Sequence, residues 1–282
     1  MNPLLTLFVE WKESVMENQL IVIRGGGDLA SGVAHRLYQC GFRLMITEQQ
    51  HPTVIRRTVA FASAVLENQM TVEGVKARHI LSLAEAPTLW QQGVIPVISA
   101  EASEICREMS PAVLVDATLA KKNTGVQRGM APVVIGVGPG FTAGDDVDAV
   151  VESRRGHWLG RVIYEGSAQP NTGVPGIIAG VGSERVLRSP ASGIFRAEAV
   201  IGDVVEAGQT VAMVDEIPVR TAIGGLLRGL LADGLPVTPG FKVGDVDPRI
   251  YPEYCHQISD KARAIGGGVL EALLHLQWKR KG

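Results

Sequence analysis

The sequence predicts an α/β protein, with a parallel β-sheet over the first two thirds of the chain and a small β module and a helix after it. Residues 20–23 form an apolar, β-branched run that enters three glycines, and a helical pattern follows them. A second apolar run, residues 133–135, enters a second glycine-rich turn. From Ser189 onward, short strands and regular turns replace this alternation. Strands that alternate with helices are typical of a parallel sheet, whereas short strands with frequent turns indicate an all-β unit.

Length and composition allow more than one folded unit. The chain has 282 residues, of which 46% are hydrophobic and 20% charged, and this is enough for one large domain or two modest ones. The pattern divides it into a sheet domain over residues 1–186, a β module over 187–249 and a helical segment over 250–282 that packs back on the first domain. A net charge of -2 and an aromatic content of 5% argue against nucleic acid or an anionic membrane as the partner.

The cysteines and the N-terminal residues bear on the compartment. Cys40, Cys106 and Cys255 lie far apart and are odd in number, which indicates free thiols and neither a disulfide frame nor a zinc site. Residues 1–19 carry several charges and lack the basic start and unbroken apolar stretch of a signal peptide, so they predict a short amphipathic helix. No segment reaches the roughly eighteen uncharged apolar residues that span a bilayer. We expect a cytoplasmic protein.

The first glycine turn has the strand–turn–helix order of a nucleotide-binding unit, which predicts a Rossmann-like sheet domain. Gly25, Gly27 and Ala30 occupy the three positions of the G-x-G-x-x-G/A pattern. The glycines, Gly26 included, let the backbone approach a phosphate, and amides at the helix start then face the anion. Asp28 stands at the same helix start, where its carboxylate could cap these amides and repel an anion. A turn that serves packing alone therefore stays open as the alternative.

Polar residues after the next strand extend this candidate nucleotide site. Glu48 ends a strand predicted over residues 42–47, roughly twenty residues after the glycines, where a carboxylate can accept hydrogen bonds from a ribose diol. Pro52 suits a first helical turn, with Arg56 and Arg57 in the next turn. Two arginines there could hold a phosphate or a carboxylate substrate. A solvated helix face explains the arginines equally well.

Asp116 and Lys121 are further candidates for substrate binding. A buried strand is predicted over residues 112–118, with Asp116 near its carboxyl end and Lys121 in the loop that follows. Ligands of open α/β sheets collect at this edge of the sheet. A polar loop that is merely solvated is the alternative.

The second glycine turn predicts a second lobe of the same site. Gly136, Gly138 and Gly140 follow the apolar run, and Thr142 offers a hydrogen-bonding group after them. Two close backbone approaches at one sheet edge favour two lobes that face each other across one ligand. The acidic residues within 145–148 lack the spacing of a calcium or zinc site, so no metal is expected.

The β module is internally duplicated with an offset of 32 residues. Gly193, Gly202 and Gly208 correspond in this way to Gly225, Gly234 and Gly240. Such a duplication predicts two similar hairpin units that bury their faces against each other. The segment resembles the biotinyl/lipoyl-type barrel-sandwich domain, a family that attaches its cofactor to a lysine at a hairpin tip. The matching tip, residues 215–220, contains no lysine, so we expect no covalent biotin or lipoate and infer a docking or lid module.

The C-terminal segment predicts a helix with glycines inside it. Ser259 or Asp260 is a candidate cap, and residues 269–274 are apolar at helical spacing. The three glycines at 266–268 either break the helix or let it press closely on another backbone. Because a lone helix is marginal in water, we expect this end to fold back on the first domain.

Five longer stretches resemble one family across nearly the whole chain. They are residues 23–30, 55–61, 138–144 (Gly-Pro-Gly-Phe-Thr-Ala-Gly), 243–249 (Val-Gly-Asp-Val-Asp-Pro-Arg) and 259–268. They resemble the accessory proteins of selenium-dependent molybdenum hydroxylase systems. The resemblance implies a role in the maturation of a molybdenum hydroxylase, and it supplies no catalytic residue.

Three functions follow from these patterns. The first is a nucleotide-binding maturation factor that binds NAD(P) or the nucleotide-bearing molybdenum cofactor across both glycine turns and docks a client hydroxylase with the β module. The second is an NAD(P)-dependent oxidoreductase whose small anionic substrate is held by Arg56 and Arg57. The third is a non-catalytic scaffold. Each is compatible with a monomer or a homo-oligomer.

Overall fold

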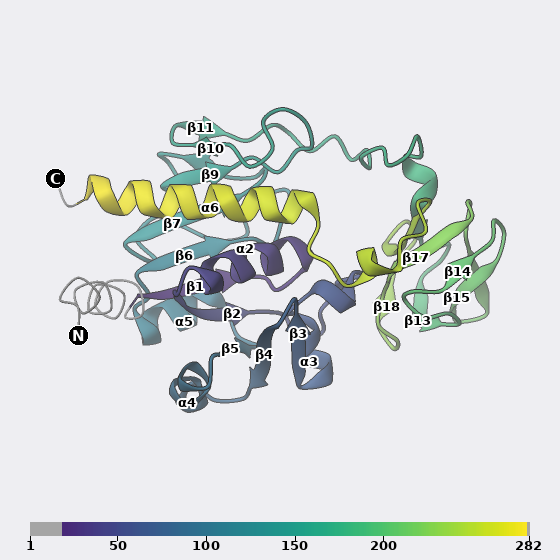
Figure 1. Cartoon of the computed structure of the whole chain (residues 1–282), viewed down its shortest axis with the longest axis horizontal. Coiled ribbons are helices and arrows are strands. Elements are labelled where there is room, and N and C mark those ends of the chain that lie inside the picture. Colours follow the sequence, from purple (N-terminus) through teal and green to yellow (C-terminus); the bar gives the residue numbers. More distant parts are fainter. Residues whose placement is uncertain (1–18, 281–282) are drawn as a thin grey trace, which may run out of the picture.

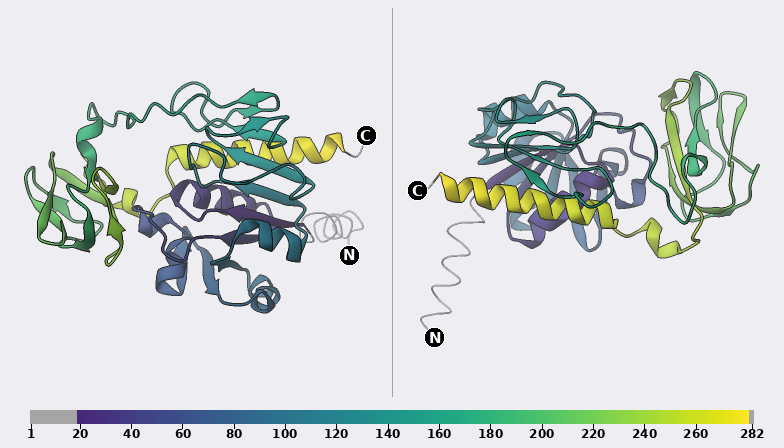
Figure 2. Two further views of the ribbon diagram at one scale, coloured as in Figure 1. Left: turned by 180° about the vertical axis from the view of Figure 1, so that it is seen from behind. Right: turned by 90° about the horizontal axis from the view of Figure 1, so that it is seen from above.

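The computed structural model describes residues 19–280 and has two unlike parts that lie end to end (Figure 1). The larger part is a nine-stranded sheet with helices on both faces, and the smaller part consists of two four-stranded antiparallel sheets. The last element, α6 (Asp260–Lys279), returns from the smaller part and runs along the larger one (Figures 1 and 2). The mixed α/β class predicted from the sequence is confirmed. The helix predicted over residues 1–19 falls outside the described residues, apart from Gln19.

The large sheet is parallel except at its edges. Its order is β10-β9-β7-β6-β1-β2-β5-β4-β3, and only the edge strands β10 and β3 run antiparallel to their neighbours. The strands are β1 (Leu20–Arg24), β2 (Arg43–Thr47), β3 (Gln69–Val72), β4 (Val75–Ile80), β5 (Val94–Ile98), β6 (Val113–Asp116), β7 (Val133–Val137), β9 (Ala149–Val151) and β10 (Val162–Ile163). The chain goes from β1 to β2, continues to the edge strand β3, returns through β4 to β5 beside β2, and then crosses to β6 on the other side of β1. The carboxyl end of β1 is therefore a switch point, where open α/β sheets bind ligands.

Side chains alternate between two hydrophobic layers along these strands. The helices that cover the layers are α2 (Asp28–Gln39), α3 (Ser63–Glu67), α4 (Ala86–Gln91), α5 (Ala102–Met109) and α6. Ile21 and Ile23 of β1 join the layer that contains residues of α2 and α6, whereas Val22 joins the layer of α4 and α5. Because all three side chains are fully buried, the strand has no polar face and forms a continuous apolar run.

The smaller part confirms the duplication predicted from the sequence. Its sheets have the orders β12-β19-β17-β14 and β16-β15-β13-β18. The strands are β12 (Val186–Arg188), β13 (Gly193–Ala197), β14 (Val204–Val205), β15 (Thr210–Val214), β16 (Ile217–Arg220), β17 (Gly225–Leu230), β18 (Pro236–Val237) and β19 (Lys242–Asp247). Strands β13, β14 and β15 recur as β17, β18 and β19, each starting 32 residues later. Side chains from both halves fill one shared core.

Helix α6 continues through its glycines without a break. Ser259 caps it by accepting a hydrogen bond from the Ala262 amide. A Cβ placed on Gly266 would lie 2.8 Å from the carbonyl oxygen of Gly32 in α2, and one on Gly268 would clash with the Gly160 carbonyl. The glycines thus let α6 press on α2 and on the loop before β10, which is one of the two outcomes expected from the sequence.

The segment before α3 differs from its prediction and joins the two parts. No helical turn begins at Pro52; a single 3-10 turn covers Arg57–Val59. The Ile55 carbonyl accepts a hydrogen bond from the Leu230 amide at 2.8 Å, and Arg57 Nε donates to the Leu230 carbonyl at 2.9 Å. This pairing with β17 holds the segment extended, in place of a local helix.

Among residues 19–280, no helix has both the length and the apolar composition needed to cross a bilayer.

Candidate functional site

The first glycine turn leaves open space above the start of α2. Gly25 has φ +90°, and a Cβ on Gly26 would lie 2.7 Å from the Ala62 amide nitrogen, so backbone conformation and packing account for these two glycines. Gly27 has ordinary backbone angles, and a Cβ on it would contact nothing within 4 Å. No side chain caps α2, whose first internal bond runs from the Ser31 amide to the Gly27 carbonyl. Gly27 therefore leaves the first amides of the helix accessible.

Two carboxylates lie beside this turn, and both are already engaged. Glu48 accepts a hydrogen bond from the Gly26 amide at 2.7 Å, and Asp28 pairs with Arg56 at 3.3 Å. Asp28 does not cap its own helix, so its carboxylate does not occupy the amides at the start of α2. Gly25, Gly27, Asp28 and Glu48 line one cavity of about 390 Å³ at the switch point.

Of the second glycine turn, Pro139 lines a cavity that Asp28 of the first turn also lines, but the three glycines do not, and the prediction that they form a second lobe is corrected. A Cβ on Gly136 would meet the Phe141 ring at 2.5 Å, one on Gly138 would meet Ser153 Oγ at 2.6 Å, and one on Gly140 would meet the Lys122 backbone at 2.6 Å. Each glycine thus accommodates a neighbour from the same chain.

Thr142 is likewise engaged within the chain. Its amide donates to Asp146 Oδ1 at 2.7 Å, and its hydroxyl lies 2.9 Å from that of Ser167. Gly136, Gly138, Gly140 and Thr142 are absent from the lining of the cavity at the first turn.

The candidate substrate residues divide into two groups. Asp116 is fully buried, accepts from Arg24 at 2.7 Å and caps the Thr118 amide at 3.0 Å, and Arg57 joins the two parts as described above. Both side chains make contacts within the chain and line neither the cavity at the first turn nor the larger one described below. The predictions that they bind substrate are therefore wrong. Arg56 and Lys121 instead line a larger cavity between the two parts.

The cavity between the parts carries a concentrated positive charge. It measures about 780 Å³ and shares Asp28, Leu29 and Leu119 with the cavity at the first turn. Its cationic lining consists of Arg56, Lys121, Arg154, Arg155, Arg185, Arg228, Lys242 and Lys261, and its carboxylates are Asp28 and Asp245. The whole chain has a net charge of only -2. Cations gathered at one cleft of such a chain favour an anionic ligand there.

Four of these cations have no carboxylate partner among the residues that the structure describes. Within residues 19–280, Lys121, Lys242, Lys261 and Arg154 form no ion pair, and Arg154 donates to the Gln169 side-chain oxygen at 2.8 Å. Desolvation by the surrounding protein lowers the pKa of Lys242, although the residue stays exposed to solvent, and Asp245 opposes the shift. Burial and the positive charge of Arg155 lower the pKa of Lys261. Both lysines thus gain from a bound anion, which would favour their charged forms.

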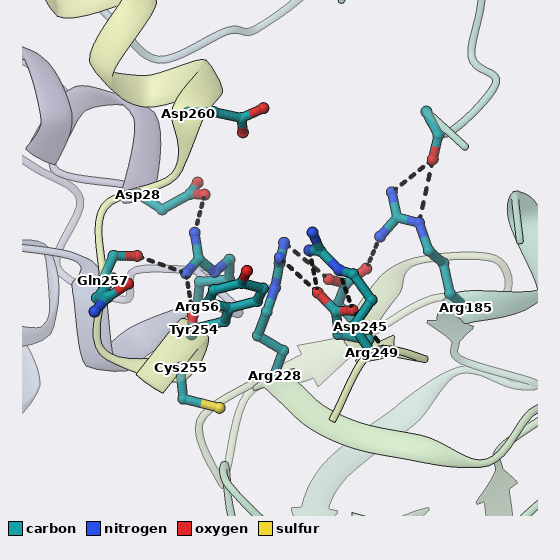
Figure 3. Close-up of polar contacts among 12 residues, drawn as sticks. Asp28, Arg56, Arg185, Arg228, Asp245, Arg249, Tyr254, Cys255, Gln257 and Asp260 are labelled. Atoms are coloured by element: carbon teal, nitrogen blue, oxygen red, sulfur yellow. Dashed lines mark hydrogen bonds and ion pairs between the residues drawn. The ribbon is translucent and has the colours of Figure 1, made fainter. Parts of the chain in front are cut away.

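The other cations belong to a network of arginines and aspartates (Figure 3). Arg228 pairs with Asp245 at 3.3 Å and with Asp247 at 3.0 Å, and Arg185 also pairs with Asp245. Arg249 donates to both oxygens of Asp247, at 2.9 and 2.7 Å. The hydrogen bonds of Arg249 hold the pKa of Asp247 below its ordinary value, against the effect of burial. This network builds the wall of the cavity that the smaller part contributes.

Sequence reasoning missed most of this cavity, although one signal was present. Asp245 and Asp247 belong to residues 243–249, one of the stretches that carry the family resemblance. Acidic residues at alternate positions of an otherwise apolar strand indicate buried ion pairs. No local sequence pattern predicts that Lys242 and Lys261 line the same cavity, because they come from different parts of the fold.

Over the described range 19–280, His, Cys, Asp and Glu side chains form no group of three or more that could hold a metal ion.

Comparisons with known proteins give one strong sequence match. No family model matches the chain. "Uncharacterized protein YqeB" of Escherichia coli (strain K12) is 55% identical over 259 residues, which cover 92% of this chain and 48% of that protein. The chain therefore spans about half the length of this curated relative.

Similarity to solved structures is weak. The structure of TcdA (CsdL) is 11% identical, with 96% of this chain and 91% of that chain covered and a TM-score of 0.36. The product-bound ectoine utilization protein EutE (DoeB) from Ruegeria pomeroyi is 12% identical, with 82% and 85% covered and a TM-score of 0.25. Scores this low support no conclusion on fold or function. The chain is similar to YqeB in sequence, and no activity follows from these matches.

Proposed function

We propose that this chain is a nucleotide-binding accessory protein that handles a nucleotide-bearing molybdenum cofactor for a molybdenum hydroxylase. The observation that carries the nucleotide part is the excess of cations in the cavity between the two parts. A ligand with several phosphate charges neutralises such an excess, whereas an uncharged ligand leaves it unbalanced. The molybdenum part rests on the sequence resemblance of the five stretches described above.

The proposed ligand extends across two adjoining cavities. Its phosphates lie between Lys242 and Lys261, and its nucleoside lies toward the first glycine turn. The shared lining by Asp28, Leu29 and Leu119 supports this arrangement, because one elongated molecule can occupy both spaces. The open position above Gly27 supports it as well.

The proposal also includes the fold family of each of the two parts. The larger part would be a Rossmann-like nucleotide-binding domain, as the parallel strand order and the glycine turn at its switch point suggest. The smaller part would be a barrel-sandwich module that docks the client enzyme. Its hairpin tip carries Asp215 and Glu216, so it would bear no covalently attached cofactor. The free cysteines support a cytoplasmic setting.

The alternative of a free-standing NAD(P)-dependent oxidoreductase has less support. It relied on Arg56 and Arg57 as holders of a small anionic substrate. Arg57 donates to the Leu230 carbonyl, and both terminal nitrogens of Arg56 are bonded within the chain. We therefore retain the accessory role.

Calorimetry with NADP, CTP and molybdopterin nucleotides tests nucleotide binding. Lys242→Ala removes an unpaired charge from the cavity and is expected to weaken the tightest of these ligands by roughly tenfold. Lys76→Ala, at an exposed position on β4, is the matched control and should leave the affinity unchanged. Equal affinities for wild type and Lys242→Ala would remove the cavity from the nucleotide site.

Co-purification tests the accessory role separately. A tagged chain expressed with a molybdenum hydroxylase is expected to retain that enzyme, and deletion of the chain should lower the enzyme's molybdenum content. Hydride transfer from NADPH to small acids by the isolated chain, with no effect on any hydroxylase, would favour the oxidoreductase.

A further inference from the structure

The two adjoining cavities carry opposite charge. The ionisable groups that line the cavity at the first turn are three carboxylates and one cation, namely Asp28, Glu48, Glu101 and Arg24. The larger cavity is lined by eight cations and two carboxylates. A ligand that extends across both therefore has its phosphates in the larger cavity, and its other end meets a negative wall.

The arginine that lines the cavity at the first turn is used within the chain. Arg24 Nη1 donates to Asp116 at 2.7 Å and to the Thr124 hydroxyl at 2.6 Å, and Asp116 is fully buried. Of the three carboxylates in the lining, Asp28 is paired with Arg56 at 3.3 Å. The negative charge of the wall therefore comes from the other two carboxylates.

These two carboxylates, Glu48 and Glu101, follow the neighbouring parallel strands β2 and β5. The Glu48 amide donates to the Ile98 carbonyl at 3.0 Å, which joins the carboxyl ends of the two strands. Among the described residues, 19–280, neither carboxylate forms an ion pair. Glu48 accepts one backbone amide on each oxygen, from Gly26 and from Gln49 at 2.7 Å each, and these bonds fix its orientation.

Glu101 keeps its hydrogen-bonding capacity for a ligand. It stands at the N-cap of α5, but its side chain accepts no hydrogen bond from that helix. The residue is exposed and lines the cavity. Its carboxylate can therefore accept hydrogen bonds from a ligand without breaking a bond at the helix start.

The order of the strands indicates which end of a nucleotide Glu101 meets. The residues shared with the larger cavity, Asp28, Leu29 and Leu119, follow β1 and β6. From there the lining passes the end of β2, which Glu48 follows, and reaches the end of β5, which Glu101 follows. The sugar of a nucleotide lies between its phosphates and its base. A nucleotide with its phosphates in the larger cavity would therefore have its sugar beside Glu48 and its base beside Glu101.

We propose that Glu101 determines the base specificity of the nucleotide site by accepting a hydrogen bond from the exocyclic amino group of the base. A carboxylate accepts hydrogen bonds and donates none. Adenine, guanine and cytosine each carry an exocyclic amino group, whereas uracil has none. The inference rests on the nucleotide binding proposed above and names the class of nucleotide, in which an amino-bearing base is selected over one that lacks this group.

Calorimetry with matched pairs of nucleotides tests the assignment. CTP, ATP and GTP are each compared with the analogue that carries hydrogen in place of the exocyclic amino group, so the phosphate charge is the same within a pair. The amino-bearing member of the tightest pair should bind roughly tenfold more tightly than its analogue.

Glu101→Ala should remove this preference. The variant is expected to lose roughly tenfold in affinity for the amino-bearing member and to bind the analogue as the wild type does. Glu104→Ala, at an exposed position of α5 outside the lining, is the matched control and should keep the wild-type preference. Lys242→Ala should weaken both members of a pair alike, because it acts on the phosphates.

The outcomes separate the role of Glu101 from nucleotide binding itself. Equal affinity of the wild type for both members of the tightest pair, or a preference that survives in Glu101→Ala, would overturn the role of Glu101 and leave nucleotide binding in place. Failure of every one of these nucleotides to bind the wild type would overturn both.

Discussion

Lys242 and Lys261 reach the cavity between the two parts from elements that are distant in the fold, β19 and α6. Neither has a carboxylate partner in the described range, and the pKa of each amine is lowered, chiefly through desolvation by the surrounding protein. The sequence could not reveal this pair, because each lysine alone looks like an ordinary surface residue. By contrast, the sequence predicts Gly27 and Glu48, because the glycine pattern and an acidic residue about twenty positions after it are both recognisable along the chain.

The lowered pKa of the two lysines predicts how nucleotide affinity depends on pH. The charged amine binds phosphate, so affinity is complete below the lowered pKa and is lost as the pH rises through it. That loss should begin at a lower pH than an ordinary lysine, with a pKa of about 10.4, would give. Calorimetry with CTP across the alkaline range measures it. Lys242→Arg, which stays charged, should shift the loss upward, and an affinity that is constant over this range would contradict the role of the lysines.

Gly27→Val should abolish nucleotide binding and leave the fold intact. The backbone at Gly27 suits any residue, and the position of its Cβ is empty, so the valine enters the mouth of the cavity without strain. Gly267→Val is the matched control, because a Cβ there also contacts nothing within 4 Å but lies on α6. Gly27→Val should unfold close to the wild type, and Gly267→Val at the same temperature or slightly above it, because valine favours a helix more than glycine does. Retained nucleotide binding by Gly27→Val would remove the first turn from the site.

At the level of elements, the two glycine turns show why equal patterns can have unequal roles. Each follows a buried parallel strand, and the sequence predicts a ligand at both. The first turn leaves Gly27 free of neighbours, whereas each glycine of the second turn meets Phe141, Ser153 or Lys122. The contacts of Gly138 with Ser153 and of Gly140 with Lys122 depend on how separate loops pack, so the glycine pattern alone does not separate the two cases. The order of strands and helices, by contrast, follows from local periodicity, and this is why the α/β class was predicted.

The contact between α6 and α2 predicts a large difference between adjacent glycines. Gly266→Leu drives a side chain into the Gly32 carbonyl, 2.8 Å from the position of its Cβ, and should lower the free energy of unfolding by roughly 1–3 kcal/mol or more. Gly267→Ala has open space and should raise it by roughly 0.5–1 kcal/mol, because alanine favours the helix. Thermal or urea unfolding measures both. Similar stabilities would show that α6 does not press on α2 as described.

At the scale of the whole molecule, the cavity exists because two parts with separate cores come together. The sequence predicts both parts, and the duplication within the smaller one, from repeated local patterns. It does not predict their junction, where the pairing of Ile55 with Leu230 and the hydrogen bonds from Arg56 to residues 254 and 257 depend on the tertiary arrangement. The candidate site lies at this junction, and for this reason the fold was more predictable than the site.

Nucleotide binding across the junction should also depend steeply on salt. Several lysines and arginines would contact the phosphates, so affinity for CTP should fall as the chloride concentration rises, through screening of these charges. Calorimetry at a series of salt concentrations measures the slope, and Lys242→Ala should make it shallower. A slope that is the same in both proteins would mean that Lys242 does not contact the ligand.

The structure of the chain co-crystallised with the nucleotide that binds it most tightly is the most direct test of the central claim. We predict phosphate density between Lys242 and Lys261, with the nucleoside extending toward Gly27. Phosphates held by the turn at Gly136–Gly140, or a nucleotide bound on a surface away from the junction, would contradict the account.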